Sequence, residues 1–414
     1  MIINKILYLF SILNHILIQI IFIDYLRGDN MNNKKRSLFK NLEALTSILL
    51  IFSTLLALII NNSSYEIFYD NFFFNTYIVE DFNVHSFVND FLMSIFFLLA
   101  GLEIKEEVLY GSLSSFKKAS FPIIASLGGV IMPAIIYTYF NLNSKYMIGV
   151  CIPISTDIAF SLGIYFLFSK YLQASLKMFL LSLAVVDDLI SMILIGTVYS
   201  SSLNLFYLSL ALLILTFLYI SNKFYKIESI TFYLMMGLLL WYFVHLSGIH
   251  STLSGILLAF VIPTKPYKKR FSPSYYIQRN FRSINNLIIM PLFAFANTGI
   301  NISSNLNLTN FPSVFLGIYL GLLVGKPLGI MIFTFLSNLL KITKKPSDLN
   351  WTSIFLSSIV CSIGFTMSIF ISEIAFANSE ELMAVARICI LLTSFTSMII
   401  SSLFIKTFKE LHII

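Results

Sequence analysis

Four charged residues occupy positions where a charge is costly, inside long apolar runs of the sequence. They are two adjacent acids, Asp187 and Asp188, a third acid, Asp157, and one lysine, Lys326. A charged side chain in the middle of a membrane span costs several kcal/mol, and most that occur there serve a function. The chemistry expected of such acids is the binding of a small cation or of protons.

The surroundings of Asp157 predict a helix that is interrupted inside the membrane. Pro153 removes a helical hydrogen bond, and the hydroxyl of Thr156 can satisfy freed backbone groups. Exposed carbonyls, a hydroxyl and a carboxylate form a hard oxygen site of the kind that small hard cations prefer. The alternative is a structural proline kink with a solvated aspartate.

Asp187 and Asp188 should differ in their partners, because adjacent residues point about 100° apart on a helix. One can bind an ion while the other meets a cation, and Lys326 is the expected partner. Two close carboxylates in a medium of low dielectric constant cannot both ionise at low cost. Such a site holds either protons or a cation, whereas the alternative is a salt bridge of structural value alone.

A second interruption is expected within residues 361–370, where Gly364 and Thr366 would unwind the helix. It falls one span after Lys326, as the first falls one span before the aspartate pair. Broken segments in corresponding positions of two halves indicate an inverted-repeat transporter with its site between them.

The elements that position these residues are long apolar runs in a chain that is 57% hydrophobic and only 11% charged. Runs of about 20 residues match the thickness of a bilayer, and their lack of alternation favours helices over a barrel. The lipid bilayer is therefore an expected partner. The predicted fold is an all-α polytopic membrane protein of about twelve transmembrane helices, at 42–61, 87–107, 119–140, 146–169, 174–199, 204–222, 229–247, 249–263, 285–300, 311–337, 351–376 and 384–406.

Basic residues alternate between the loops, and this alternation predicts the orientation of the chain. Nearly all lysines and arginines of the loops fall on one side, which places both ends of the twelve-span unit in the cytoplasm of a bacterial cell. The net charge of +7 is thereby explained without nucleic acid. The first outside loop should contain a short β-hairpin in its aromatic stretch at 72–79.

The remaining features predict one membrane domain at 31–414 and no enzyme. Residues 1–30 form a doubtful extension, and we expect translation to begin at Met31. The three cysteines give no metal spacing, and no zinc motif, nucleophile elbow or nucleotide loop is present. No cofactor is therefore expected. Glycines at 317, 321, 325 and 329 share one helix face and should allow close helix contact.

Several strings, taken in order, resemble the NhaA-type sodium/proton antiporters from about residue 38 to residue 408. The matching strings are GLEIK at 101–105, TDIAF at 156–160, VDDL at 186–189, SGIH at 247–250, PLFAFAN at 291–297, GKPLG at 325–329 and GFTMS at 364–368. Their combination is highly specific.

The resemblance implies an electrogenic antiporter in the inner membrane that exports sodium or lithium for a larger number of protons and supports pH homeostasis. Asp188 would be the principal sodium ligand, with Asp187 its neighbour in the ion-binding pair. Thr156 and Asp157 would lie beside them on the crossing broken helix, and Lys326 would pair with Asp187 and carry a proton. A homodimer, helped by the outside hairpin, is also implied.

The sequence departs from the family pattern where its members sense pH. Glu106 stands where many members carry arginine, and Gln278 and Arg279 align with an acid–histidine pair. Glu103 and His250 remain as candidates for a pH response. The alternative hypothesis is a sodium-coupled symporter of a small organic solute, which would need a larger polar cavity.

Overall fold

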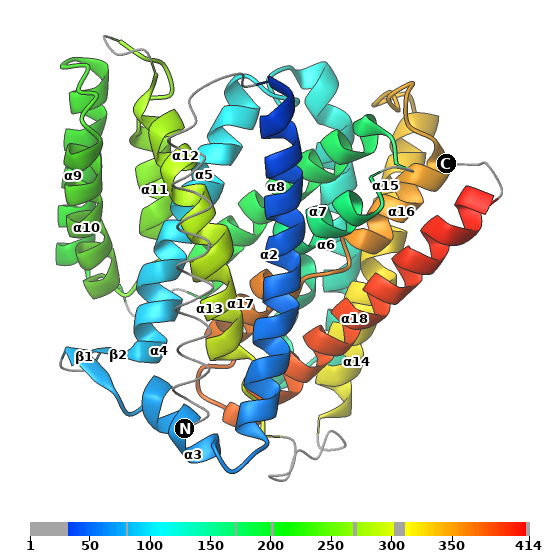
Figure 1. Ribbon diagram of the computed structural model, residues 1–414, viewed down its shortest axis with the longest axis horizontal. Helices are drawn as coiled ribbons and strands as arrows, with labels where there is room; N and C mark the ends of the chain where they lie inside the picture. The colour runs from blue at the N-terminus through cyan, green and yellow to red at the C-terminus, as the bar shows by residue number, and fades with distance from the viewer. Residues whose placement is uncertain are drawn as a thin grey trace. The chain divides into compact units, whose positions relative to one another are not determined.

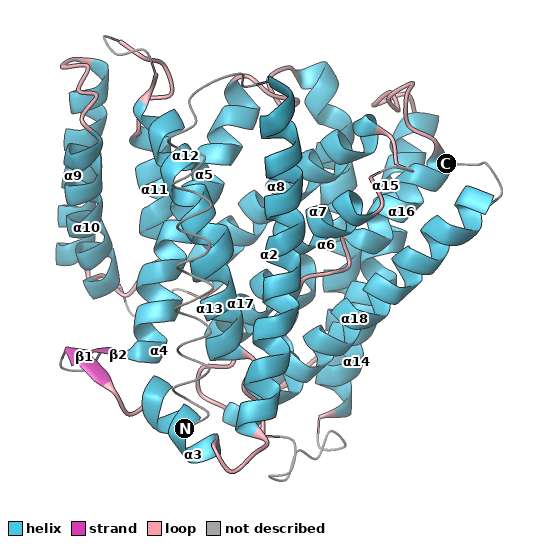
Figure 2. Ribbon diagram, viewed as in Figure 1, coloured by secondary structure: helices cyan, strands magenta, loops and turns pink. Residues whose placement is uncertain are grey.

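The computed structural model describes residues 32–79, 82–169, 172–199, 203–267, 271–301 and 311–410 of the chain. These residues are mainly helical, with one small pair of strands (Figure 2). Residues 43–414 form one compact unit, and of the other unit, residues 1–42, only the start of one helix is described. The prediction for residues 1–30 therefore falls outside the described residues.

Several of the helices are broken or continue through a short 3-10 or π-helical stretch (Figure 1). In chain order they are α2 (Asn32–Asn61), α3 (Glu66–Phe73), α4 (Val84–Ser86) with η1 (Phe87–Leu92) and α5 (Met93–Leu109), α6 (Phe116–Asn141), η2 (Lys145–Ile154), α7 (Ile158–Leu167), α8 (Ala174–Val198), α9 (Leu205–Lys223), α10 (Ile230–Leu246), α11 (Leu253–Val261), α12 (Pro273–Ile284) with η3 (Asn285–Ile289) and α13 (Met290–Asn297), α14 (Pro312–Leu320) with η5 (Gly321–Gly325) and α15 (Lys326–Leu339), α16 (Trp351–Val360), α17 (Phe365–Ala375) and α18 (Glu380–Glu410).

Each of the twelve predicted spans contains helix. Within the described residues, eight spans are long and apolar enough to cross a membrane, and the bent pair α16 and α17 makes a ninth. Helix α10 is apolar but shorter, and α11 has only nine residues. The helix that contains the start of the ninth predicted span, at 285, extends further toward the N-terminus than the apolar run. The helix begins at Pro273, because the Ser272 hydroxyl accepts a hydrogen bond from the Tyr275 N–H and caps the first turn.

Two interrupted spans meet inside the membrane unit, as the sequence predicts. In the first, the 3-10 helix η2 ends at Ile154 and α7 begins at Ile158, with extended backbone between them. In the second, α16 and α17 are bent by 46° at the break after Val360. The Asp157 N–H donates to the Ile363 carbonyl at 2.8 Å, so each break supplies a backbone partner to the other.

The predicted outside hairpin is present but lies later than expected. Strands β1 (Tyr77–Val79) and β2 (Phe82–Asn83) pair antiparallel. Phe72 and Phe73, which the prediction placed in the hairpin, belong to α3 instead. Phe73 is buried and packs its ring against Phe295, so tertiary contact overrides the β preference of this aromatic stretch.

The glycine face predicted around Lys326 packs against α6. A Cβ built on Gly329 would lie 2.0 Å from the carbonyl oxygen of Gly128, and one built on Gly128 would lie 2.2 Å from that of Gly329. No side chain fits between two backbones at this separation, so α6 and α15 touch directly. This contact places Lys326 beside α6, and α6 also packs against α8, which carries Asp187 and Asp188.

Candidate ion-binding site

Asp157 lies at the point where the two broken spans cross and caps both of their half-helices. Its Oδ1 accepts the Phe160 N–H at 3.0 Å, at the start of α7. Its Oδ2 accepts the Thr366 N–H at 3.0 Å and the Thr366 hydroxyl at 2.6 Å, at the start of α17. Both helix N-termini carry partial positive charge, so they stabilise a negative charge placed between them.

Both carboxylate oxygens of Asp187 have polar partners. Lys326 Nζ lies 3.0 Å from Asp187 Oδ2, and both side chains are completely buried. The Thr156 hydroxyl donates to the same oxygen at 2.7 Å, and the Ser126 hydroxyl donates to Oδ1. Lys326 also donates to the Ile154 carbonyl, which the break before α7 leaves free. The pair is therefore an ion pair with hydrogen-bond partners on both sides.

Asp188 has the opposite character, because both of its carboxylate oxygens are buried without a hydrogen-bond partner in the described part of the chain. Its side chain is 1% exposed. A buried carboxylate without partners is costly, so it is expected to take up a proton or a cation. Adjacent residues on α8 thus have different surroundings, as their angular offset predicts.

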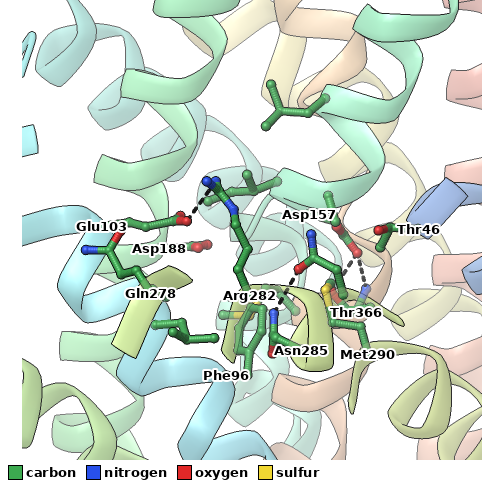
Figure 3. Close-up of a pocket in the computed structure, with 17 residues that line it drawn as sticks. Thr46, Phe96, Glu103, Asp157, Asp188, Gln278, Arg282, Asn285, Met290 and Thr366 are labelled. Carbon is green, nitrogen blue, oxygen red and sulfur yellow. Dashed lines mark hydrogen bonds and ion pairs between the residues drawn. The ribbon is translucent and has the colours of Figure 1, made fainter. Parts of the chain in front are cut away.

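Asp188 and Asp157 line the same small cavity, together with Thr366 and Glu103 (Figure 3). Its volume of about 70 Å³ is enough for a small ion with a few waters. Among the residues that the structure describes, no three acidic, histidine or cysteine side chains are close enough to enclose a metal ion. The carboxylates therefore face shared space and do not form a closed cage.

Glu103 lines this cavity and is paired with Arg282, whose Nη2 lies 3.0 Å from Glu103 Oε1. Glu103, Gln278 and Arg282 also line a second, wider cavity of about 340 Å³, which continues to Glu106 and Glu107. The small cavity therefore adjoins a wider one bordered by three glutamates.

A separate cavity of about 600 Å³ lies beyond the far end of α17. Glu373 lies on its wall and pairs with Arg387, whose Nε donates to Glu373 Oε1 at 2.7 Å. His85 Nε2 lies 3.8 Å from the other oxygen of Glu373. This outer cavity shares no lining residue with the cavity at Asp188.

Aromatic side chains from several elements gather around Phe370 of α17, between the two cavities. The ring of Phe370 lies 5.2 Å from that of Phe97, 6.3 Å from that of Phe293 and 5.3 Å from that of His250. Phe370, Phe97 and Phe293 are each 1% exposed. The cluster therefore seals the path between Thr366 and Glu373 in this conformation.

The structure brings together most of the predicted site residues. Asp157, Asp188 and Glu103 line one cavity. Asp187 and Lys326 form the adjoining ion pair, to which the Thr156 hydroxyl donates a hydrogen bond. His250 is placed elsewhere: its Nδ1 lies 2.9 Å from the Thr252 hydroxyl, and it is not on the cavity wall.

The sequence reasoning missed three participants. Thr366 was expected only to unwind a helix, yet it supplies two of the donors to Asp157. Arg282 was expected only as a topology signal, and Ser126 was not singled out at all. A hydroxyl beside the paired glycines 128 and 129 of α6 is the one signal that could have pointed to Ser126.

Comparison with known proteins agrees with this architecture. The sequence model of the family described as Na+/H+ antiporter 1 matches residues 37–405. The chain belongs to this antiporter family. The Na(+)/H(+) antiporter NhaA of Helicobacter pylori strain J99 is 42% identical over 364 residues, covering 78% of this chain and 83% of that protein. The NhaA protein of Actinobacillus pleuropneumoniae serotype 3 strain JL03 is 39% identical over 380 residues, covering 89% and 95%.

Membership of the antiporter family confirms the resemblance found in the ordered strings of the sequence. The described helices agree with a multi-pass membrane protein, which the family and the apolar spans both indicate. The names of these two relatives describe each of them as an antiporter of sodium ions and protons.

Proposed function

We propose that this protein exchanges Na+ or Li+ for protons, with the cation and a proton competing for Asp188. Family membership supports the exchange itself. The observation that supports the site is the pair of unpartnered Asp188 oxygens, buried on the wall of a small cavity. A carboxylate in this position is neutralised either by a proton or by a cation, because a bare buried charge is costly. Mutually exclusive occupancy is the coupling that an antiporter requires.

Asp157 is the second ligand that we propose for the cation. It faces the same cavity and is held between two helix N-termini. Those termini attract negative charge and would oppose a bare cation. The carboxylate of Asp157 offsets their field, so a cation can approach Asp188 without meeting uncompensated positive ends.

We assign the second proton to the Asp187–Lys326 pair. Lys326 is completely buried, and within the described residues Asp187 is the acid that forms an ion pair with it. A cation entering beside Asp188 would repel the ammonium group and promote loss of its proton. Release of one proton from Asp188 and one from Lys326 per cation would make the exchange electrogenic.

We further propose that the cavity bordered by glutamates opens to the cytoplasm. The cytoplasmic placement rests on the basic residues of the loops, which put both ends of the twelve-span unit on that side of the inner membrane. Glu103, Glu106 and Glu107 would concentrate cations at this entrance. With Gln278 and Arg279 replacing the usual acid–histidine pair, we propose a pH response that runs through Glu103 and Arg282, and a contribution from His250.

A homodimer in the membrane is part of the same proposal, with the hairpin of β1 and β2 near its contact. The alternative, a symporter of an organic solute, has less support. Sites for organic ligands typically measure about 300–1,000 Å³, whereas the cavity at Asp188 measures about 70 Å³.

Ion flux in proteoliposomes tests the proposal. With an imposed proton gradient and no organic solute, we expect Na+ to discharge the gradient, and Asp188→Asn to abolish this response. The matched control is Asp348→Asn, at an exposed aspartate outside the site, which should behave as wild type. Discharge that requires an organic solute, or that survives in Asp188→Asn, would contradict the proposed function.

A further inference from the structure

A polar face of α12, continued into η3, borders the small cavity at Asp188. Gln278, Arg282 and Asn285 are spaced four and three residues apart, so they lie on the same side of the helix. All three line the cavity. The charged residue of this face, Arg282, is therefore part of the cavity wall.

Arg282 is the only basic residue among the described residues that line the small cavity and the wider one beside it. The acids of the same two walls are Glu103, Glu106, Glu107, Asp157 and Asp188. A fixed positive charge on a wall shared with Asp188 repels a cation that binds there. Arg282 is thus the one charge of these walls that works against cation binding.

Glu103 offsets the charge of Arg282. Arg282 Nη2 lies 3.0 Å from Glu103 Oε1, and Figure 3 shows the guanidinium group turned toward that carboxylate. The side chain of Arg282 is 39% exposed and that of Glu103 is 28% exposed, so the pair is partly solvated. Partly solvated ion pairs contribute little to stability. The place of this pair on the walls of both cavities therefore points to an effect of its charges on the ion.

We propose that the Arg282–Glu103 pair sets the affinity of the site for the transported cation, with Arg282 lowering that affinity and Glu103 raising it. This inference rests on the proposed function, in which the cation binds at Asp188. The cation is subject to the sum of the two charges, which is zero in the intact pair.

The two members of the pair have opposite effects on cation binding. Loss of the guanidinium group leaves one net negative charge on the cavity wall, which attracts a cation. Loss of the carboxylate leaves one net positive charge, which repels it. Each loss breaks the same ion pair, so a purely structural role would give both losses the same sign.

The test is the KM for Na+ in Na+-driven proton flux of proteoliposomes, measured at an alkaline pH where the wild-type KM no longer changes with pH. Competition by protons at Asp188 is then absent from the comparison. We expect Arg282→Gln to lower the KM by about three- to tenfold and Glu103→Gln to raise it by about the same factor. The double variant Arg282→Gln/Glu103→Gln has zero net charge again, so its KM should return to within about twofold of wild type.

Two control variants separate the charge of Arg282 from its geometry and its helix. Arg282→Lys keeps the positive charge but loses the guanidinium fork, and its KM should stay within about twofold of wild type. Arg279→Gln removes an exposed charge of the same helix from a position outside both cavity walls, and its KM should stay unchanged. Because the pair is partly exposed, added choline chloride should reduce the KM shifts of Arg282→Gln and Glu103→Gln.

The outcomes separate the two proposals. If wild type shows no Na+-driven proton flux, the proposed function fails. If wild type exchanges Na+ but Arg282→Gln and Glu103→Gln do not shift the KM in opposite directions, the role of the pair alone is refuted. Should Arg282→Gln not fold, Glu103→Gln must raise the KM while Arg282→Lys leaves it unchanged. An unchanged or lowered KM in Glu103→Gln overturns the inference.

Discussion

Asp157 should be the residue on which the crossing of the two broken spans most depends. Its carboxylate accepts hydrogen bonds from the Phe160 N–H, the Thr366 N–H and the Thr366 hydroxyl. All three donors are buried, and the two N–H groups belong to the first turns of different helices. Replacing Asp157 with alanine removes the shared acceptor and leaves these donors in an apolar surrounding.

The cost can be worked from these contacts. Two buried N–H groups left without acceptors cost about 1–3 kcal/mol each, which makes about 2–6 kcal/mol for Asp157→Ala. Asp157→Asn keeps one oxygen, which can serve one helix start but not both. We therefore expect Asp157→Asn to lose about half as much stability as Asp157→Ala, with one donor still unpaired.

The assay is equilibrium unfolding of the purified protein in detergent micelles, followed by circular dichroism. Asp348→Ala, at an exposed aspartate, should change the free energy of unfolding by no more than about 0.5 kcal/mol. If Asp157→Ala also falls within that limit, the carboxylate does not hold the half-helices together, and the reasoning is refuted. Equal losses in Asp157→Ala and Asp157→Asn would refute the argument from two separate acceptors.

Two further predictions concern Lys105 and Asp70, which lie outside the candidate ion-binding site. Lys105 Nζ donates to three carbonyls at the C-terminal end of α11. Lys105→Met should therefore lower the free energy of unfolding by about 2–4 kcal/mol in the same micelle assay. The control Lys344→Met, at an exposed lysine, should leave the free energy of unfolding unchanged. Burial and the carboxylates of Glu66 and Glu380 raise the pKa of Asp70 above its usual range. Ionised Asp70 therefore destabilises the fold at pH values above the pKa that Asp70 has in the unfolded chain. Asp70→Asn should raise the melting temperature at about pH 7 but not at about pH 3. An equal rise at both values would show that charge is not the cause.

The elements and most of the site residues could be predicted, because a bilayer makes the relevant signals strong. Apolar runs of bilayer length define the helices, and a charge inside such a run is so costly that Asp157, Asp188 and Lys326 are conspicuous. Pro153 and Gly364 indicate where two of the helices break. The hairpin was misplaced since Phe72 and Phe73 suit either a strand or a buried helix face, and packing against Phe295 decides the matter.

What the sequence could not predict depends on how helices are rotated against one another. The angle between Asp187 and Asp188 follows from helix geometry, but that geometry alone does not say which of them faces Lys326, and only the resemblance to the antiporter family indicated Asp187. The pairing of Glu103 with Arg282 joins positions 179 residues apart in the chain. Ser126 is equally inconspicuous, because a serine in an apolar helix can bond to its own backbone.

The length of α17 between Thr366 and Glu373 has an electrical consequence. Seven residues of helix rise about 10 Å, against about 30 Å for the hydrocarbon core of a bilayer. Since cavities lie at both ends of that interval and the Phe370 cluster fills it, most of the membrane voltage drops across a septum about one third of the bilayer thick. Moving one charge across this septum gains nearly the whole of about 2.3 kcal/mol per 100 mV.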